Sequence, residues 1–317
     1  MSESVRYQKL IESARHIPMS CCAVAHPCDA SSLSAAVEAG RLGLFRPVLI
    51  GPSSKIQSVA RDEGIDISGI QIIDTPHSHA SAERAVECVQ SGQASLLMKG
   101  SLHSDELLHA ILKHKGGLRT ERRLSHVFIM DVPNYDELLF ITDAAVNIFP
   151  DLETKADILR NAIDLHHALG LGTPRVAILS AVEQVTSKIP TTLEAAALCK
   201  MADRGQIAGG VLDGPLALDN AISPEAARVK GITSPVAGYA QILLVPDLEA
   251  GNMLAKNLTF LGGASAAGIV LGAKVPVILT SRADSSSAKL ASCAVASLYA
   301  NYLTRNVAKP VSGAVNA

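Results

Sequence analysis

Short, continuously apolar runs alternate along this chain with longer amphipathic segments, and this alternation is the feature that most restricts its fold. Continuously apolar runs predict strands that are covered on both faces, and such strands belong to largely parallel sheets flanked by helices. We therefore predict an α/β fold with doubly wound topology. The predicted strands are residues 47–51, 70–74, 94–100, 126–132, 138–146, 175–182, 209–216, 241–248 and 275–281.

The amphipathic segments carry helix start and stop signals. Asp29 and Ser78 are predicted N-caps of two helices, and Gly92 ends the second of them. A third helix is expected at about residues 153–169, and an Ala-rich helix at 286–305. No repeat or low-complexity linker interrupts the pattern.

Composition excludes several classes of protein. Hydrophobic residues make up 48% and charged residues 18% of the 317 residues, which argues against disorder. The net charge is −2, so no general basic field would hold nucleic acid. No apolar run approaches the roughly 20 residues of a membrane span, and the polar N-terminus does not resemble a signal peptide. The six cysteines form no CxxC pair and are interpreted as small buried residues in a reducing compartment, so we expect a cytoplasmic protein.

Polar residues follow several predicted strands, where parallel sheets bind ligands. Lys99, Ser101 and Ser104 follow one strand and precede a helix, so a cation, hydroxyls and free backbone N–H groups could bind an anion such as phosphate. Ser281 and Arg282 repeat this arrangement before the last helix, and arginine can donate two hydrogen bonds to one phosphate. Alternatively, these residues only form turns or surface ion pairs.

Standard motifs are missing. The sequence has no GxxxxGK[ST] phosphate loop, no GxGxxG after a strand and no GxSxG nucleophile motif. No His, Cys and Asp spacing indicates a metal site, so we predict none.

Taken together and in order, the segments from about residue 94 onward resemble the phosphate acetyltransferase/phosphate butyryltransferase family. They are LLMKGSLHSDELLHAIL, GLRTERRLSHVF, TDAAVNIFPDLETKADIL, GGVLDGPLALDNAIS and VPDLEAGNMLAKNLTFLGGASAAGIVLGAKVPVILTSRADS. GLRT, LSHV and the Ser-Arg-Ala-Asp-Ser form look more like the butyryltransferase branch.

This resemblance implies two α/β/α domains with a cleft between them, as in isocitrate and isopropylmalate dehydrogenases, usually in a homodimer. The domains would be residues 1–148 plus 283–317, and residues 149–282. The implied reaction is acyl-CoA + phosphate ⇌ acyl phosphate + CoA, with CoA as co-substrate and no bound cofactor. The acyl chain length, acetyl or butyryl, stays open.

The resemblance also assigns roles to single residues. Ser281 and Arg282 match a Ser-Arg pair of the family, and Arg119 and Asn252 are expected to contact substrate. Acetyltransferases of the family carry an aspartate regarded as general base at the position of Ala288, so this chain cannot use that base. Asp284 is the candidate replacement, or it caps the last helix instead.

Two other functions stay open. The missing aspartate is compatible with a non-catalytic sensor of acyl-CoA or acyl phosphate. An NAD(P)-dependent dehydrogenase on the same fold would need a nicotinamide site, usually with clustered metal ligands, and the sequence shows neither.

Overall fold

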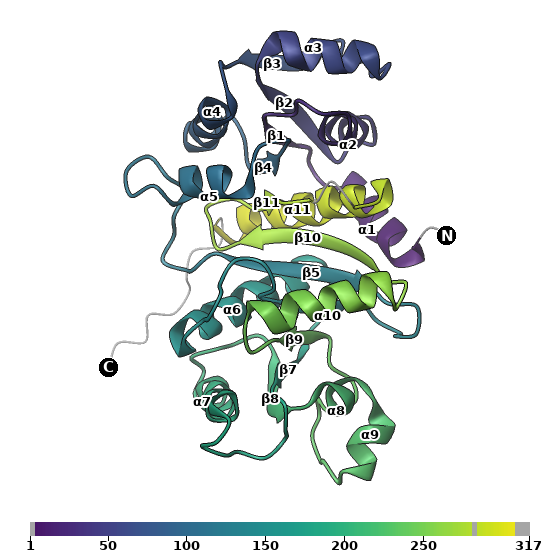
Figure 1. Cartoon of the computed structure of the whole chain (residues 1–317), viewed down its shortest axis with the longest axis vertical. Coiled ribbons are helices and arrows are strands. Elements are labelled where there is room, and N and C mark those ends of the chain that lie inside the picture. Colours follow the sequence, from purple (N-terminus) through teal and green to yellow (C-terminus); the bar gives the residue numbers. More distant parts are fainter. Residues whose placement is uncertain (1–3, 281–283, 308–317) are drawn as a thin grey trace.

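The computed structural model describes residues 4–280 and 284–307. The strands of this part are β1 (Ser20–Ala25), β2 (Phe45–Gly51), β3 (Gln71–Asp74), β4 (Leu96–Lys99), β5 (Ser125–Asp131), β6 (Leu139–Thr142), β7 (Arg175–Leu179), β8 (Val211–Leu216), β9 (Ile242–Leu244), β10 (Ser265–Leu271) and β11 (Val277–Ile278). They form one sheet in the order β3-β2-β1-β4-β11-β10-β5-β6-β9-β7-β8 (Figure 1). The predicted α/β class is thereby confirmed.

Strand direction changes in the middle of this sheet. β3, β2, β1, β4 and β11 are mutually parallel, and β8, β7, β9 and β6 are mutually parallel. Between them, β10 is antiparallel to both β11 and β5, and β5 is antiparallel to β6. The two parallel groups therefore run in opposite directions, and their carboxyl ends lie at opposite edges of the sheet.

Helices cover both faces of the sheet. They are α1 (Val5–Arg15), α2 (Ala30–Arg41), α3 (Ser53–Asp62), α4 (Ser78–Gln90), α5 (Ser104–Leu112), α6 (Leu152–Ala168), α7 (Pro190–Asp203), α8 (Leu218–Ile222), α9 (Pro224–Val229), α10 (Leu248–Phe260) and α11 (Ser286–Val307). α2 and α4 lie on opposite sides of the β1–β2 region (Figure 1). In β1, Cys22 and Val24 join one apolar cluster and Ala23 and Ala25 join another, as expected for a strand covered on both faces.

Two strands were not predicted. β1 consists mostly of small residues, and β10 begins with Ser-Ala-Ala-Gly, so only its last three residues form a bulky apolar run. The predicted strand 138–146 is shorter than expected because the Asp143 carboxylate accepts hydrogen bonds from the backbone N–H groups of Ala145, Val146 and Asn147 and so forms a turn.

The predicted helix starts were mostly correct. Asp29 caps α2 through a 2.7 Å hydrogen bond from the Ser32 N–H. The predicted cap Ser78 is wrong: the His77 ring accepts the Ala80 N–H at 3.2 Å, and Ser78 is the first residue of α4. The division into two domains stays a prediction.

Candidate functional site

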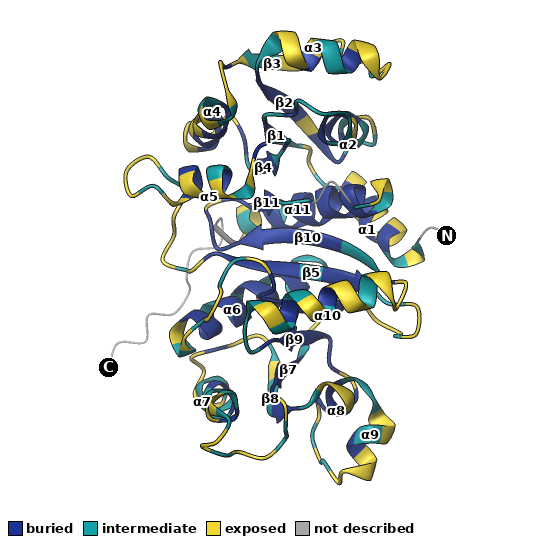
Figure 2. Cartoon of the chain, viewed as in Figure 1, coloured by how far each residue is buried: buried dark blue, intermediate teal, exposed yellow. Residues whose placement is uncertain are grey.

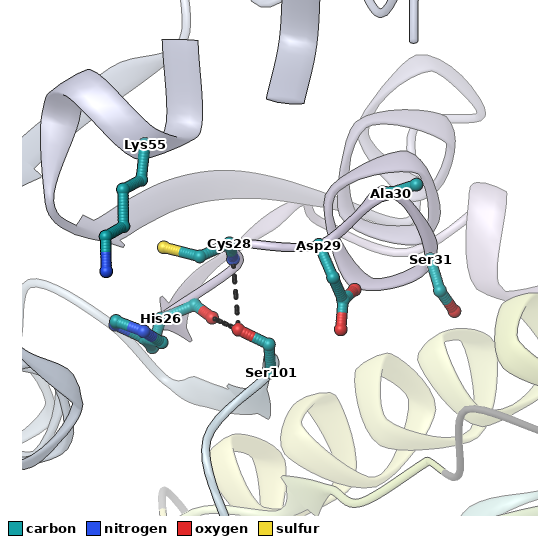
Figure 3. A pocket seen from close by; sticks show the side chains of 7 residues that line it. All are labelled: His26, Cys28, Asp29, Ala30, Ser31, Lys55 and Ser101. Atoms are coloured by element: carbon teal, nitrogen blue, oxygen red, sulfur yellow. Dashed lines mark hydrogen bonds between the residues drawn. The ribbon is translucent and has the colours of Figure 1, made fainter. Parts of the chain in front are cut away.

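A pocket lies where the carboxyl ends of β1, β2 and β4 meet. Its volume is about 560 Å³, and its lining residues are His26, Cys28, Asp29, Ala30, Ser31, Lys55 and Ser101 (Figure 3). His26 follows β1, Lys55 lies in the first turn of α3 after β2, and Ser101 follows β4. The pocket therefore occupies the position where α/β sheets bind ligands.

The wall of the pocket is fixed by the backbone of His26. This residue has a φ of 57°, a left-handed conformation that is uncommon for any residue other than glycine. Its carbonyl oxygen accepts hydrogen bonds from the Cys28 N–H at 2.8 Å, the Ser101 N–H at 2.8 Å and the Ser101 hydroxyl at 2.9 Å. A side chain on Gly100 would place its Cβ 2.4 Å from the same oxygen. Glycine at position 100 thus lets the loops after β1 and β4 pack directly on each other.

Burial and the nearby Lys55 ammonium shift the pKa values of two ionisable groups in the pocket, His26 and Cys28. Burial, with a smaller contribution from the Lys55 ammonium, lowers the pKa of His26, so the imidazole is neutral at pH 7. Burial raises the pKa of the Cys28 thiol to about 11. A thiol with that pKa is protonated at neutral pH and is a poor nucleophile.

One lysine lines the pocket, and a second lysine contacts a lining residue from another helix. Figure 3 shows the Lys55 ammonium pointing into the pocket from α3, on the side of His26 and Cys28. Lys55 makes no ion pair within residues 4–280 and 284–307. From α11, the largely buried Lys289 donates a 2.6 Å hydrogen bond to the Ser31 hydroxyl, which connects the first turn of that helix to the pocket. The carboxylate of Asp29 also faces the pocket, so the site contains both a positive and a negative side chain.

Three predicted residues lie at or near this pocket. Lys99 is the last residue of β4, and its ammonium donates a 3.2 Å hydrogen bond to the Gly100 carbonyl oxygen. Ser101 lines the pocket, and Ser104 is the half-buried first residue of α5. β11 is parallel to β4 and ends at the same edge.

The other predicted catalytic residues are placed only in part. Ser281 and Arg282 lie outside the described residues. Asp284 is half-buried, and at the start of α11 the Ser285 hydroxyl accepts the Ala288 N–H at 3.2 Å. Both expected roles of Asp284, as catalytic base and as helix cap, therefore stay predictions.

Arg119 and Asn252 lie at the opposite edge of the sheet. Asn252 donates a 3.3 Å hydrogen bond to the carbonyl oxygen of Ala144, which follows β6. Arg119 is exposed, and its backbone forms an isolated antiparallel β-bridge with Ala273, just after the carboxyl end of β10. Since β6 and β10 run opposite to β4, this chain does not bring these two residues to the pocket.

Sequence reasoning missed the pocket residues His26, Cys28 and Lys55. The signal was the short run CCAVA followed by HPCD, in which small apolar residues end in polar ones. Nothing in the sequence marked Lys55 as a pocket residue, because one lysine in a helix is usually a surface residue.

Two classes of site are not found in the described part of the chain. It contains no group of three or more His, Cys, Asp or Glu side chains that could hold a metal ion. Among its helices, none combines the length and the apolarity needed to cross a membrane.

Comparison with known proteins identifies relatives along almost the whole chain. Residues 80–297 match the family model described as "Phosphate acetyl/butaryl transferase". The chain is 64% identical to the phosphate acetyltransferase of Rhizobium meliloti, over 93% of both chains. It is 42% identical to the phosphate butyryltransferase of Clostridium acetobutylicum, over 93% of this chain and 98% of that one.

A solved structure agrees with these relatives. The crystal structure of a branched-chain phosphotransacylase from Enterococcus faecalis has a TM-score of 0.78 and 31% identity, covering 89% of this chain and 99% of that chain. The motifs pointed toward the butyryltransferase branch, whereas the identities of 64% and 42% favour the acetyltransferase relative. At the level of the family the prediction is confirmed: this chain belongs to the phosphate acetyl/butyryl transferase family.

Proposed function

We propose that this protein catalyses acyl-CoA + phosphate ⇌ acyl phosphate + CoA, with acetyl as the acyl group. The observation that carries this proposal is the 64% identity to a phosphate acetyltransferase across 93% of both chains. CoA is then a substrate, and no bound cofactor is required. We also propose a cytoplasmic homodimer, and a division into the two domains 1–148 plus 283–317 and 149–282.

The reaction proceeds by direct attack in a ternary complex. The CoA thiolate attacks the carbonyl carbon of the acyl phosphate, a carbon–sulfur bond forms, and the carbon–oxygen bond to phosphate breaks as phosphate leaves. A thiol with a pKa near 8.5 is already a few per cent thiolate at neutral pH, so a strong base is not essential. Cys28, the cysteine of the pocket, holds a protonated thiol, which supports a route without an acyl-enzyme.

The residues that follow β11 carry the chemistry in this proposal. Ser281 donates to the developing oxyanion, and Arg282 neutralises the leaving phosphate. Asp284 accepts the thiol proton, since Ala288 has no ionisable group and is 4% exposed. Lys99, Ser101 and Ser104 bind phosphate at the same edge of the sheet.

The test is phosphate-dependent release of the CoA thiol, measured with a thiol reagent such as DTNB. Acetyl-CoA and butyryl-CoA are compared at equal concentrations, with and without phosphate. We expect turnover only with phosphate, and a higher kcat/KM for acetyl-CoA. Ser281→Ala should lower kcat by roughly 10²–10³-fold, the usual loss for one oxyanion donor, and Arg282→Ala should lower it steeply.

The rival functions give different results. Tight CoA binding by folded protein without phosphate-dependent release would favour the sensor. NAD(P) reduction with a hydroxy acid would favour the dehydrogenase. The expected phosphate-dependent release would exclude both as the main activity.

A further inference from the structure

Two buried hydroxyl groups hold the ring of His26 at the wall of the pocket. Nδ1 of His26 lies 3.1 Å from the Ser81 hydroxyl oxygen, and that oxygen lies 2.8 Å from the Thr75 hydroxyl oxygen. The Ser81 hydroxyl also donates a 2.9 Å hydrogen bond to the His77 carbonyl oxygen. Ser81 and Thr75 are both buried, so water does not replace these contacts. The orientation of the ring is therefore set by α4 and the loop before it.

This network also determines which ring nitrogen of His26 carries the proton. A carbonyl oxygen only accepts, so the single hydroxyl proton of Ser81 is directed to His77. Toward His26 the Ser81 oxygen can then only accept, and Nδ1 is the nitrogen that donates. Since burial lowers the pKa of His26, the ring is neutral at pH 7 and its other nitrogen, Nε2, is an acceptor.

Nε2 of His26 is available to a ligand in the pocket. Within residues 4–280 and 284–307 it makes no hydrogen bond, yet it is not a buried atom. His26 lines the pocket, and Figure 3 shows its ring beside the Lys55 ammonium. The pocket thus presents a hydrogen-bond acceptor next to a positive charge.

Donors surround this acceptor. The Ser31 hydroxyl oxygen accepts from the Lys289 ammonium at 2.6 Å, so its own proton can be donated to a ligand. The N–H groups of Ala30 and Ser31 are the first two of α2 and have no partner within that helix. The Asp29 carboxylate also faces the pocket, but the two ammonium groups, of Lys55 and Lys289, outnumber it. Together these groups suit an anion that itself carries a proton.

We propose that His26 makes this pocket specific for hydrogen phosphate over sulfate. The proposal rests on the proposed function, in which phosphate is a substrate bound at this edge of the sheet. Lys55 and the donors of α2 bind the unprotonated oxygens of hydrogen phosphate, and its P–OH group donates to Nε2 of His26. Sulfate has the same charge and a similar shape but no proton, so it places an oxygen lone pair against that of Nε2. An acceptor left unpaired in this way lowers affinity.

The first experiment compares four dianions by isothermal titration calorimetry on the full chain, at pH 8, constant ionic strength and without CoA. Hydrogen phosphate and hydrogen arsenate carry a proton, whereas sulfate and fluorophosphate do not. Wild type is expected to bind the first two more tightly than the last two by about tenfold or more. Equal affinities for all four anions, or no binding of phosphate, would overturn the proposal.

Variants separate the acceptor from the positive charge. His26→Gly removes the ring at a residue whose φ of 57° suits glycine, and should bring the four affinities within about threefold of each other. Lys55→Met should weaken binding of all four anions by a similar factor and preserve their ratio. His79→Ala is the matched control, because His79 shares the first turn of α4 with Ser81 but its side chain is 72% exposed. It should keep the wild-type ratio, whereas a His26→Gly protein that did so would refute the role of His26.

Ser81→Ala tests the network behind the ring. Without the Ser81 oxygen, Nδ1 loses its acceptor and Nε2 can carry the proton instead, so phosphate should bind more weakly and sulfate more tightly than in wild type. Nitrogen NMR spectra should show the proton on Nδ1 in wild type, with the His26 signals assigned by their absence in His26→Gly. A proton on Nε2 in the wild-type protein would overturn the proposal even if a variant failed to fold.

The anion titrations need no turnover, so they are read separately from the CoA-release assay. CoA release by a protein that binds phosphate and sulfate equally would overturn the specificity alone. Phosphate selectivity without CoA release would support the role of His26 and count against the proposed acyl transfer.

Discussion

At the scale of single residues, the centre of the sheet contains a histidine held next to a glycine. His126 of β5 is 2% exposed, and its ring packs edge-on against Phe128 with 4.3 Å between ring centroids. A side chain on Gly268 of β10 would place its Cβ 2.9 Å from Nε2 and 3.2 Å from Cε1 of this ring. Gly268 is thus required by the volume of the neighbouring ring rather than by its backbone conformation.

Gly268→Ala is therefore expected to destabilise the protein by about 1–3 kcal/mol, the usual cost of overpacking a core. The free energy of unfolding in urea measures this change. In a His126→Ala background, where the ring is absent, the cost of the same substitution should be smaller. Equal costs in both backgrounds would show that the ring is not the cause.

The same histidine gives stability a dependence on pH. Burial lowers the pKa of His126 to about 4, and its Nδ1 has no hydrogen-bond partner among the described residues. An unfolded chain would take up this proton near pH 6.5. Between pH 6.5 and 4 the unfolded state therefore binds more protons, and stability falls as pH falls, by on the order of 3 kcal/mol in total.

We expect His126→Gln to reduce this loss, because glutamine does not titrate. Thermal or urea unfolding at pH 7 and pH 4.5 should show a smaller difference between the two pH values in the variant than in wild type. Other groups titrate in both proteins, so the comparison isolates His126. Parallel pH profiles would contradict the prediction.

At the scale of secondary-structure elements, one side chain connects α1 to the middle of the sheet. The Tyr7 hydroxyl accepts the Ala267 N–H at 2.9 Å and lies 2.6 Å from the Ile129 carbonyl oxygen and 2.8 Å from that of Ser265. Tyr7 is fully buried, so water cannot replace these hydrogen bonds.

Tyr7→Phe leaves the Ala267 N–H and a carbonyl oxygen without their partner. We expect a loss of about 1–3 kcal/mol in the free energy of unfolding. Tyr239→Phe provides the control, since Tyr239 is 55% exposed and its hydroxyl can bond to water; it should change stability by less than about 0.5 kcal/mol. A loss of similar size in the control variant would refute the role assigned to Tyr7.

The elements also show how far sequence reasoning extends. Aliphatic runs such as those of β2 and β7 were recognisable because both faces of these strands are buried. β1 and the first half of β10 were missed because their small residues suit close packing against helices but lack strand preference. The position of Lys99 and Ser101 at a carboxyl edge was predictable from local order along the chain. That Arg119 and Asn252 lie at the other edge was not, because strand direction depends on the antiparallel pairs in the centre of the sheet.

At the scale of the whole molecule, one apolar cluster extends across both halves of the sheet. It contains Leu49 of β2 in one half and Ile178 of β7 in the other, and α1, α2, α6, α7 and α11 cover it. α11 contacts α1, α2 and α6, and so belongs to both halves. The two clusters on the opposite face are, by contrast, separate.

Because the shared cluster cannot be opened on one side only, we expect the molecule to unfold in a single cooperative transition. Calorimetry should give one peak, with the calorimetric enthalpy close to the van't Hoff enthalpy. Leu198→Ala removes a fully buried side chain of α7 and should cost about 2–5 kcal/mol. Under mildly denaturing conditions it should accelerate amide exchange of β2, far from the substitution, as much as that of β7. If β7 alone responded, each half would fold as an independent unit despite the continuous sheet.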